Sequence, residues 1–113
     1  MKQAVVIKAH QASYANPIIA IKGTLVKCIK RDPDFPGWVW CEDATGLDGW
    51  VPESYLQFDG DHAELLEDYD ALELTISEGE RLDIIKEIAG WYFCQNESDQ
   101  YGWVPVENLK INA

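Results

Sequence analysis

Apolar and polar residues alternate along several short stretches of the chain, with the period of two that is typical of β-strands. The alternation is clear in residues 74–76 (Leu-Thr-Ile) and 82–84 (Leu-Asp-Ile). Two further stretches, 91–94 and 101–104, are rich in aromatic residues, which favour strands. Glycines separate the stretches, and none has the 3.6-residue apolar spacing of an amphipathic helix. The pattern predicts an all-β protein of short strands, as in small barrels.

The strand pattern occurs twice. Residues 37–41 (Gly-Trp-Val-Trp-Cys) align with residues 90–94 (Gly-Trp-Tyr-Phe-Cys) at an offset of 53. At the same offset, residues 49–52 (Gly-Trp-Val-Pro) align with residues 102–105, which have the same sequence. Two ordered sets of motifs in one register indicate an internal repeat.

The repeat predicts two domains joined by a short linker. Each copy spans only fifty-odd residues of the 113-residue chain, so each domain is of the smallest kind that folds. The polar residues 59–61 (Asp-Gly-Asp) have the composition of a linker. We therefore expect one barrel over residues 1–58 and a second barrel over residues 62–113.

The charge of the chain narrows the classes of partner. The net charge is −11, and residues 59–113 carry the imbalance, with fourteen Asp/Glu against three Lys/Arg. Residues 1–58 hold six of each and are neutral. Because the second half is so acidic, it repels phosphate groups. We therefore expect neither nucleic acid nor an anionic membrane as a partner. No stretch approaches the length of a membrane helix, and the apolar run at the N-terminus is too short for a secretory signal, which favours the cytoplasm.

Both copies resemble the Src homology 3 (SH3) domain. Residues 65–69 (Leu-Leu-Glu-Asp-Tyr) stand where that family has its Ala-Leu-Tyr-Asp-Tyr opening, and residues 102–105 resemble its closing strand. In the first copy, residues 6–10 (Val-Ile-Lys-Ala-His) occupy the opening position and residues 49–56 match the end. The motifs look like the variant class found in bacterial proteins. The resemblance implies two small SH3-like barrels in tandem.

The resemblance also implies a non-catalytic module that binds a peptide or a partner surface, with proline-containing or basic segments as the expected ligands. In this family, aromatic rings wall shallow slots for a polyproline II peptide, and an acidic loop pairs with a basic ligand residue. The residues implied for the slots are Trp38, Trp50, Pro52 and Tyr55 in the first copy, with Tyr14 as a further aromatic, and Tyr69, Trp91, Trp103 and Pro105 in the second, beside an acidic loop of Asp68, Asp70 and Glu73.

Each copy departs from the family pattern in a different way. The first copy has Lys8 and His10 where tyrosines are usual, and its long loop, residues 11–21, has no acidic residue. The second copy keeps the acids but has Glu67 and Asn108 at tyrosine positions. Considered copy by copy, each groove is therefore incomplete.

The sequence holds no constellation that predicts catalysis, a metal site or a cofactor. His10 and His62 lie in different copies, and no nucleophile elbow, phosphate-binding loop or zinc-peptidase motif occurs. The cysteines Cys28, Cys41 and Cys94 are odd in number and lack zinc-motif spacing. The resemblance places them at core positions, where a free cysteine packs as a small hydrophobe.

Two alternatives to peptide binding remain open. The aromatic faces could pack between the barrels or in self-association, which would make the protein a structural or assembly component. Cell-wall binding is a third reading, because distant bacterial relatives with similar barrels bind peptidoglycan; the missing export signal disfavours it.

Overall fold

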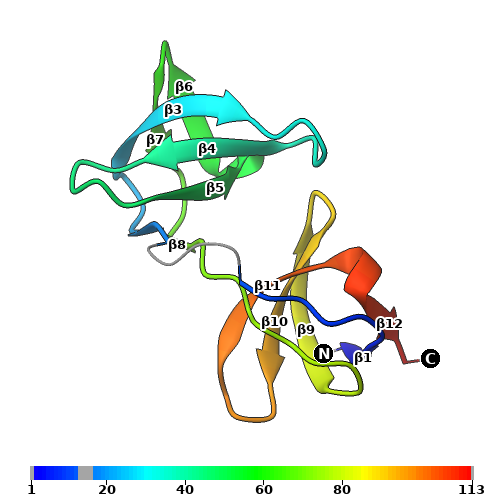
Figure 1. Ribbon diagram of the computed structural model, residues 1–113. Helices are drawn as coiled ribbons and strands as arrows, with labels where there is room; N and C mark the ends of the chain where they lie inside the picture. The colour runs from blue at the N-terminus through cyan, green and yellow to red at the C-terminus, as the bar shows by residue number, and fades with distance from the viewer. Residues whose placement is uncertain (1, 13–16, 113) are drawn as a thin grey trace. The chain divides into compact units, whose positions relative to one another are not determined.

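The computed structural model describes residues 2–12 and 17–112 of the chain (Figure 1). The described residues form twelve strands and two short 3₁₀ helices, η1 (Glu53–Tyr55) and η2 (Val106–Asn108). Within these residues no helix has the length and apolar character needed to cross a membrane. The all-β fold predicted from the alternating pattern is confirmed.

The chain divides into two compact units, and each is a small barrel. One unit is discontinuous and consists of Met1–Ser13 and Leu72–Ala113; we call it the split barrel. The other is Tyr14–Ala71, which we call the continuous barrel. These units differ from the boundaries expected from the repeat, 1–58 and 62–113, because the first strand of each repeat lies in the barrel formed by the rest of the other repeat.

The continuous barrel contains a five-stranded antiparallel sheet and a two-stranded sheet (Figure 1). In the larger sheet the strand order is β5-β4-β3-β7-β6, and in the smaller one β2 pairs with β8. The bounds are β2 (Ile19–Ala20), β3 (Leu25–Arg31), β4 (Trp38–Glu42), β5 (Asp48–Pro52), β6 (Leu56–Asp59), β7 (His62–Leu65) and β8 (Tyr69–Asp70).

The split barrel has a matching five-stranded sheet with the order β11-β10-β9-β1-β12. The predicted stretches 82–84, 91–94 and 101–104 lie in its strands, whereas residues 74–76 contribute only an isolated bridge through Ile76. Its strands are β1 (Lys2–Val6), β9 (Arg81–Ile88), β10 (Trp91–Asn96), β11 (Tyr101–Pro105) and β12 (Leu109–Ile111).

The opening strands of the two repeats are exchanged. β1 belongs to the first repeat, yet it pairs with β9 and β12 of the second. β7 belongs to the second repeat, yet it pairs with β3 and β6 of the first. The two strands fill equivalent places, since Ala4 pairs with Leu82 just as Ala63 pairs with Val26. We refer to this arrangement as the segment exchange.

A tight turn at the seam of the repeats explains why β7 stays with the first repeat. Asp59 and His62 are paired partners in the β6–β7 ladder, which leaves Gly60 and Asp61 as a two-residue hairpin loop. Gly60 has φ 64°, and a glycine with positive φ at the first loop position is the requirement of a type II′ turn. A two-residue loop joins only adjacent antiparallel strands. The tripeptide that has the composition of a linker therefore holds β7 against β6.

Burial of β1 and β7 side chains holds the exchanged segments in place. Val6 lies in the core of the split barrel, and Leu65 is fully buried in the continuous barrel. Burying one such side chain stabilises a fold by roughly 1.5–3 kcal/mol.

Cys94 and Cys41 are fully buried, as expected for core cysteines, while Cys28 is partly exposed. The core of the split barrel comprises Ala4, Val6, Leu74, Ile76, Leu82, Ile84, Cys94, Val104 and Leu109.

The segment exchange also relocates charge. Residues 59–71 carry six acidic residues into the continuous barrel, which then holds twelve Asp/Glu and four Lys/Arg. The split barrel holds eight Asp/Glu and five Lys/Arg. The acidity assigned by sequence to the second half of the chain therefore lies mainly on the barrel that contains most of the first half.

Candidate peptide-binding grooves

The continuous barrel carries an aromatic ladder on β4 and β5. Trp38 is the cross-strand partner of Pro52, and Trp40 is the partner of Trp50. Side chains two residues apart on a strand point to the same face, so these four lie on one face of the sheet. The backbone N–H of Glu53 donates to the carbonyl of Gly37 at 2.7 Å, which fixes the start of η1 beside Trp38. The pairing of β4 with β5 thus places the tryptophans of the first repeat side by side, and the contact at Gly37 positions η1 next to them.

Tyr69 from the second repeat joins this aromatic set. β8 pairs with β2, with Tyr69 opposite Ala20. The Tyr69 ring meets the Tyr55 ring edge-on at a centroid distance of 5.5 Å, and its hydroxyl donates to the Trp50 carbonyl at 2.6 Å. The groove that lacks an opening tyrosine within the first repeat thus obtains one from the second.

The segment exchange divides the predicted acidic loop. Asp68 and Asp70 lie in the continuous barrel, where an Asp68 carboxylate oxygen accepts the backbone N–H of Lys22 at 2.8 Å and Asp70 pairs with Ile19. Glu73 lies in the split barrel. We call the set of Trp38, Trp50, Pro52, Tyr55, Asp68, Tyr69 and Asp70 the composite groove, because both repeats contribute to it.

Exposure varies along the composite groove. Trp38 is 4% exposed, and Tyr55 and Tyr69 are each 6% exposed, so these rings are more covered than the resemblance implied. Trp50 is half-buried and meets the equally half-buried Trp40 edge-on at 5.0 Å. The Lys30 ammonium lies 5.8 Å from the centroid of the Trp50 ring, within reach of a cation–π contact. The more accessible part of the aromatic surface is therefore around Trp50.

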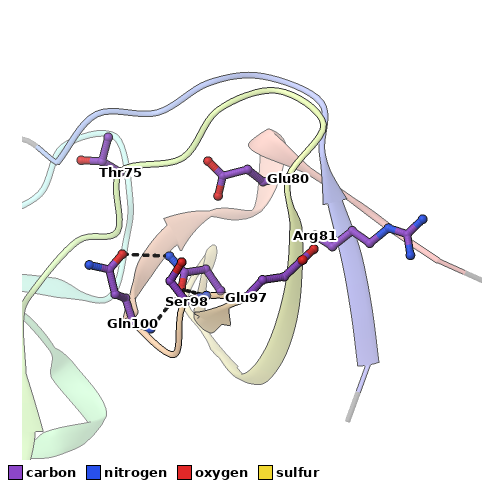
Figure 2. Close-up of a pocket in the computed structure, with 7 residues that line it drawn as sticks. Thr75, Glu80, Arg81, Glu97, Ser98 and Gln100 are labelled. Atoms are coloured by element: carbon purple, nitrogen blue, oxygen red, sulfur yellow. Dashed lines mark hydrogen bonds between the residues drawn. The ribbon is translucent and has the colours of Figure 1, made fainter.

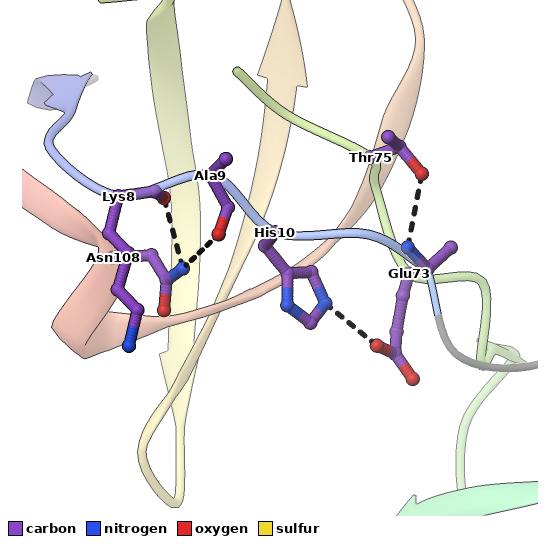
Figure 3. Close-up of polar contacts among 7 residues, drawn as sticks. Lys8, Ala9, His10, Glu73, Thr75 and Asn108 are labelled. Carbon is purple, nitrogen blue, oxygen red and sulfur yellow. Dashed lines mark hydrogen bonds and ion pairs between the residues drawn. The ribbon is translucent and has the colours of Figure 1, made fainter. Parts of the chain in front are cut away.

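The split barrel has a different arrangement at the equivalent place. His10, in the position of Tyr69, meets the Trp91 ring edge-on at 5.8 Å. Its Nε2 lies 2.9 Å from a Glu73 carboxylate oxygen (Figure 3). The Glu73 side chain is only 9% exposed, so this acid is already engaged within the barrel.

The remaining predicted residues of the split barrel pack within it. Trp103 is buried and lies 5.2 Å from the Phe93 ring, with the Lys86 ammonium 5.9 Å from its centroid. Pro105 is buried opposite Trp91. Tyr14, predicted as a further aromatic of the first repeat, lies outside the described residues.

Asn108 fastens the exchanged N-terminal segment, a role that sequence reasoning missed. Its side-chain amide donates to the carbonyls of Lys8 and Ala9 at 3.0 and 3.1 Å (Figure 3). Its own backbone carbonyl accepts the N–H of Ile7 at 2.9 Å. The sequence did contain a signal for this role. An asparagine at a position where tyrosine is usual has a polar amide that needs hydrogen-bond partners when it is buried.

We expect Asn108→Ala to destabilise the split barrel by about 1–3 kcal/mol, because two backbone carbonyls lose their donor. Urea unfolding followed by alkylation of Cys94 measures this change. Asn112→Ala, an exposed asparagine next to β12, is the control and should change stability little. An equal effect of both variants would contradict the fastening role.

A shallow polar pocket of about 430 Å³ lies elsewhere on the split barrel (Figure 2). The Asn96 side-chain oxygen at its edge accepts the backbone N–H groups of Ser98 and Gln100 and so shapes the turn. None of the predicted groove residues lines it, and no group of three or more potential metal ligands occurs among the residues that the structure describes. Its lining residues include Thr75, Glu80, Arg81, Glu97, Ser98 and Gln100.

Comparison with known families agrees with the two sequence repeats. Residues 4–59 match the family of variant SH3 domains, and residues 67–106 match the family of SH3 domains. No curated protein and no solved structure matches the chain. Domains of these families are in general protein-interaction modules and are typically non-catalytic. With its tandem motifs and two small barrels, the chain belongs to the SH3 family and carries two such domains in tandem.

Proposed function

We propose that the protein binds a basic, proline-containing segment of a partner protein at the composite groove. The observation that carries the proposal is the position of Tyr69, whose ring contacts Tyr55 and whose hydroxyl bonds the Trp50 backbone. This position completes the aromatic set that a polyproline II peptide needs. Flat rings of this kind offer apolar contact area at a low cost in side-chain entropy.

The charge of the continuous barrel favours a basic ligand. Twelve acidic residues against four basic ones give this barrel an attractive field for cations, and Asp68 and Asp70 flank Tyr69. The split barrel, with eight acidic and five basic residues, has the weaker attraction for cations. We therefore assign the basic ligand to the composite groove, and expect its association rate to fall as salt is added.

The covered rings imply that binding is coupled to opening. Trp38, Tyr55 and Tyr69 present little surface, so a peptide must first contact the half-buried Trp50 region. The apparent affinity is then reduced by the fraction of molecules in the open state. We expect weak binding with an association rate below that of a preformed groove.

The same burial favours a second candidate function. Trp38, Tyr55, Tyr69 and Trp103 could serve packing alone, which would make the protein a structural or assembly component. The two candidates differ in whether a ligand reaches the rings, and a titration separates them.

The test is proton–nitrogen NMR of the full chain, titrated with a synthetic proline-rich peptide that carries an arginine at one end. We expect the indole signals of Trp38 and Trp50 to shift and saturate. Tyr69→Ala should weaken binding about tenfold or more, as for a buried aromatic anchor. Tyr69→Phe, which keeps the ring, should retain most of the affinity. It is the control that separates a loss of ring contacts with the peptide from a loss of folding.

His10→Ala is the matched control, because His10 occupies the equivalent position in the split barrel. It should leave the response of Trp38 and Trp50 intact. Indole signals that stay still at millimolar peptide in the folded protein would exclude the binding function and support the structural role. A shift of the Trp91 indole that is lost in His10→Ala but kept in Tyr69→Ala would place the site on the split barrel instead.

A further inference from the structure

Two of the three cysteines face each other across neighbouring strands of the continuous barrel. Cys28 on β3 and Cys41 on β4 are direct register partners. Directly opposed side chains in an antiparallel pair lie on the same face of the sheet. The two thiols therefore meet on the core side, where Cys41 is fully buried and Cys28 is partly exposed.

The backbone hydrogen bonds show which kind of pair this is. The N–H of Cys28 donates to the carbonyl of Asp61 at 2.7 Å, so it points toward β7 and away from β4. In an antiparallel sheet, a residue bonded to the strand on one side forms a non-hydrogen-bonded pair with the strand on the other side. Such pairs have Cα atoms about 4.5 Å apart, the closer of the two spacings.

This geometry suits a disulfide. Disulfide-linked residues have Cα separations of about 4.4–6.8 Å, and the spacing of a non-hydrogen-bonded pair falls at the lower end of that range. The register shifts between Cys28 and Lys30, which marks a β-bulge next to the pair. A bulge locally loosens the ladder and lets the two strands adjust to an S–S bond.

The split barrel provides an internal comparison. The pair that occupies the equivalent position there is Ile84 and Cys94, which are also register partners. An isoleucine and a cysteine fill the site by packing alone, so the fold does not require two thiols. The continuous barrel thus has a second thiol where its counterpart has an alkyl group.

We propose that Cys28 and Cys41 form a cross-strand disulfide by reaction with a low-molecular-weight disulfide such as oxidised glutathione. The partly exposed Cys28 loses its proton and its sulfur attacks the glutathione disulfide, which releases one glutathione thiolate and leaves a mixed disulfide. Cys41 then loses its proton and attacks the Cys28 sulfur, which releases the second glutathione. Two protein thiols are oxidised and one glutathione disulfide is reduced to two thiols.

The reaction is slow at neutral pH and accelerates in alkali. Burial raises the pKa of the Cys28 thiol, although the neighbouring Cys41 thiol and Arg31 oppose the shift. Burial also raises the pKa of Cys41, with a further rise from Cys28. Because the thiolate attacks, the rate climbs about tenfold per pH unit below the thiol pKa, and a raised pKa lowers the rate at neutral pH and extends this climb to more alkaline pH.

The test uses the reduced full chain, incubated with oxidised glutathione, quenched in acid, denatured and alkylated. We expect intact-mass spectrometry to find a product two hydrogens lighter with one alkylated cysteine, and peptide mapping to join Cys28 to Cys41. Cys28→Ile, which installs the residue of the split barrel, should abolish the internal disulfide. Cys94→Ala should leave it unchanged.

Two results would overturn the proposal. One is a chain that keeps three alkylatable thiols after incubation at pH 8.5. The other is a product that stops at a mixed disulfide or joins Cys94 to another cysteine. The same incubation in 6 M guanidinium unfolds the barrel, so that Cys28 and Cys41 are no longer held opposite each other. We expect disulfides between different pairs of the three cysteines there, which would show that the fold causes the selectivity.

Discussion

Replacing Ala4 with aspartate should unfold the split barrel and leave the continuous barrel folded. Ala4 is 0% exposed and lies between Leu82 and Ile111 in the core of the split barrel. A carboxylate buried there without a partner costs about 3–5 kcal/mol, which is a large share of the stability of so small a unit. Cys94, in the same core, then becomes accessible, while Cys41 stays protected.

Pulsed alkylation of the native protein, read by peptide mass spectrometry, measures this outcome. Ala63→Asp is the matched variant, because Ala63 is 1% exposed and holds the equivalent place in β7. This variant should make Cys41 accessible to the alkylating reagent and leave Cys94 inaccessible. If each repeat formed its own barrel, Ala4→Asp would expose Cys41 and Ala63→Asp would expose Cys94, so a reversal of the two results would disprove the segment exchange.

Local pattern was enough to predict the fold class and the strands β9, β10 and β11. The aromatic stretches that became β10 and β11, and the alternation in β9, depend on propensity and periodicity within a few residues. The repeat at an offset of 53 likewise indicated two similar barrels. These features are local, so they do not depend on which segments meet in space.

The partner of each opening strand could not be predicted from pattern alone. β1 and β7 present the same kinds of side chain at equivalent places, with Ala4 and Val6 matching Ala63 and Leu65. Either strand satisfies either core, so apolar periodicity cannot choose between them. The sequence held one discriminating signal. Gly60-Asp61 between two strands is a two-residue hairpin loop, which ties β7 to β6.

This ambiguity also affected the candidate site. Counting residues repeat by repeat left the first groove without its opening tyrosines and without an acidic loop, and the second with fewer rings. The segment exchange places Tyr69, Asp68 and Asp70 beside the aromatic residues of the first repeat. A functional set built from two distant segments is visible only once the pairing of the strands is known.

Gly102→Ala should destabilise the split barrel far more than Gly49→Ala destabilises the continuous barrel. The two glycines hold equivalent positions, opposite Cys94 and Cys41. A Cβ on Gly102 would lie 2.6 Å from the backbone nitrogen of Leu74 and 2.8 Å from its Cβ. These are closer than real Cβ contacts, so the backbone around Leu74 must move.

That movement would disturb a bonded segment. The N–H of Leu74 donates to the Trp103 carbonyl at 3.0 Å, and the N–H of Trp103 donates to the Leu72 carbonyl at 2.9 Å. Overpacking that shifts backbone and weakens such bonds costs about 3 kcal/mol, less the 0.4–1 kcal/mol or so that alanine recovers by restricting the unfolded chain. Urea unfolding, followed by alkylation of Cys94, should show an earlier midpoint.

Gly49→Ala is the matched control, because Gly49 holds the equivalent position in the continuous barrel. A Cβ there would meet the Ala71 side chain at 3.1 Å and the Ile18 side chain at 3.4 Å, and both can yield by a few tenths of an ångström. The expected cost is about 1 kcal/mol or less, measured by the exposure of Cys41. An equal loss of stability in the two barrels would contradict this contact. It would mean that the backbone at Leu74 does not lie this close to β11.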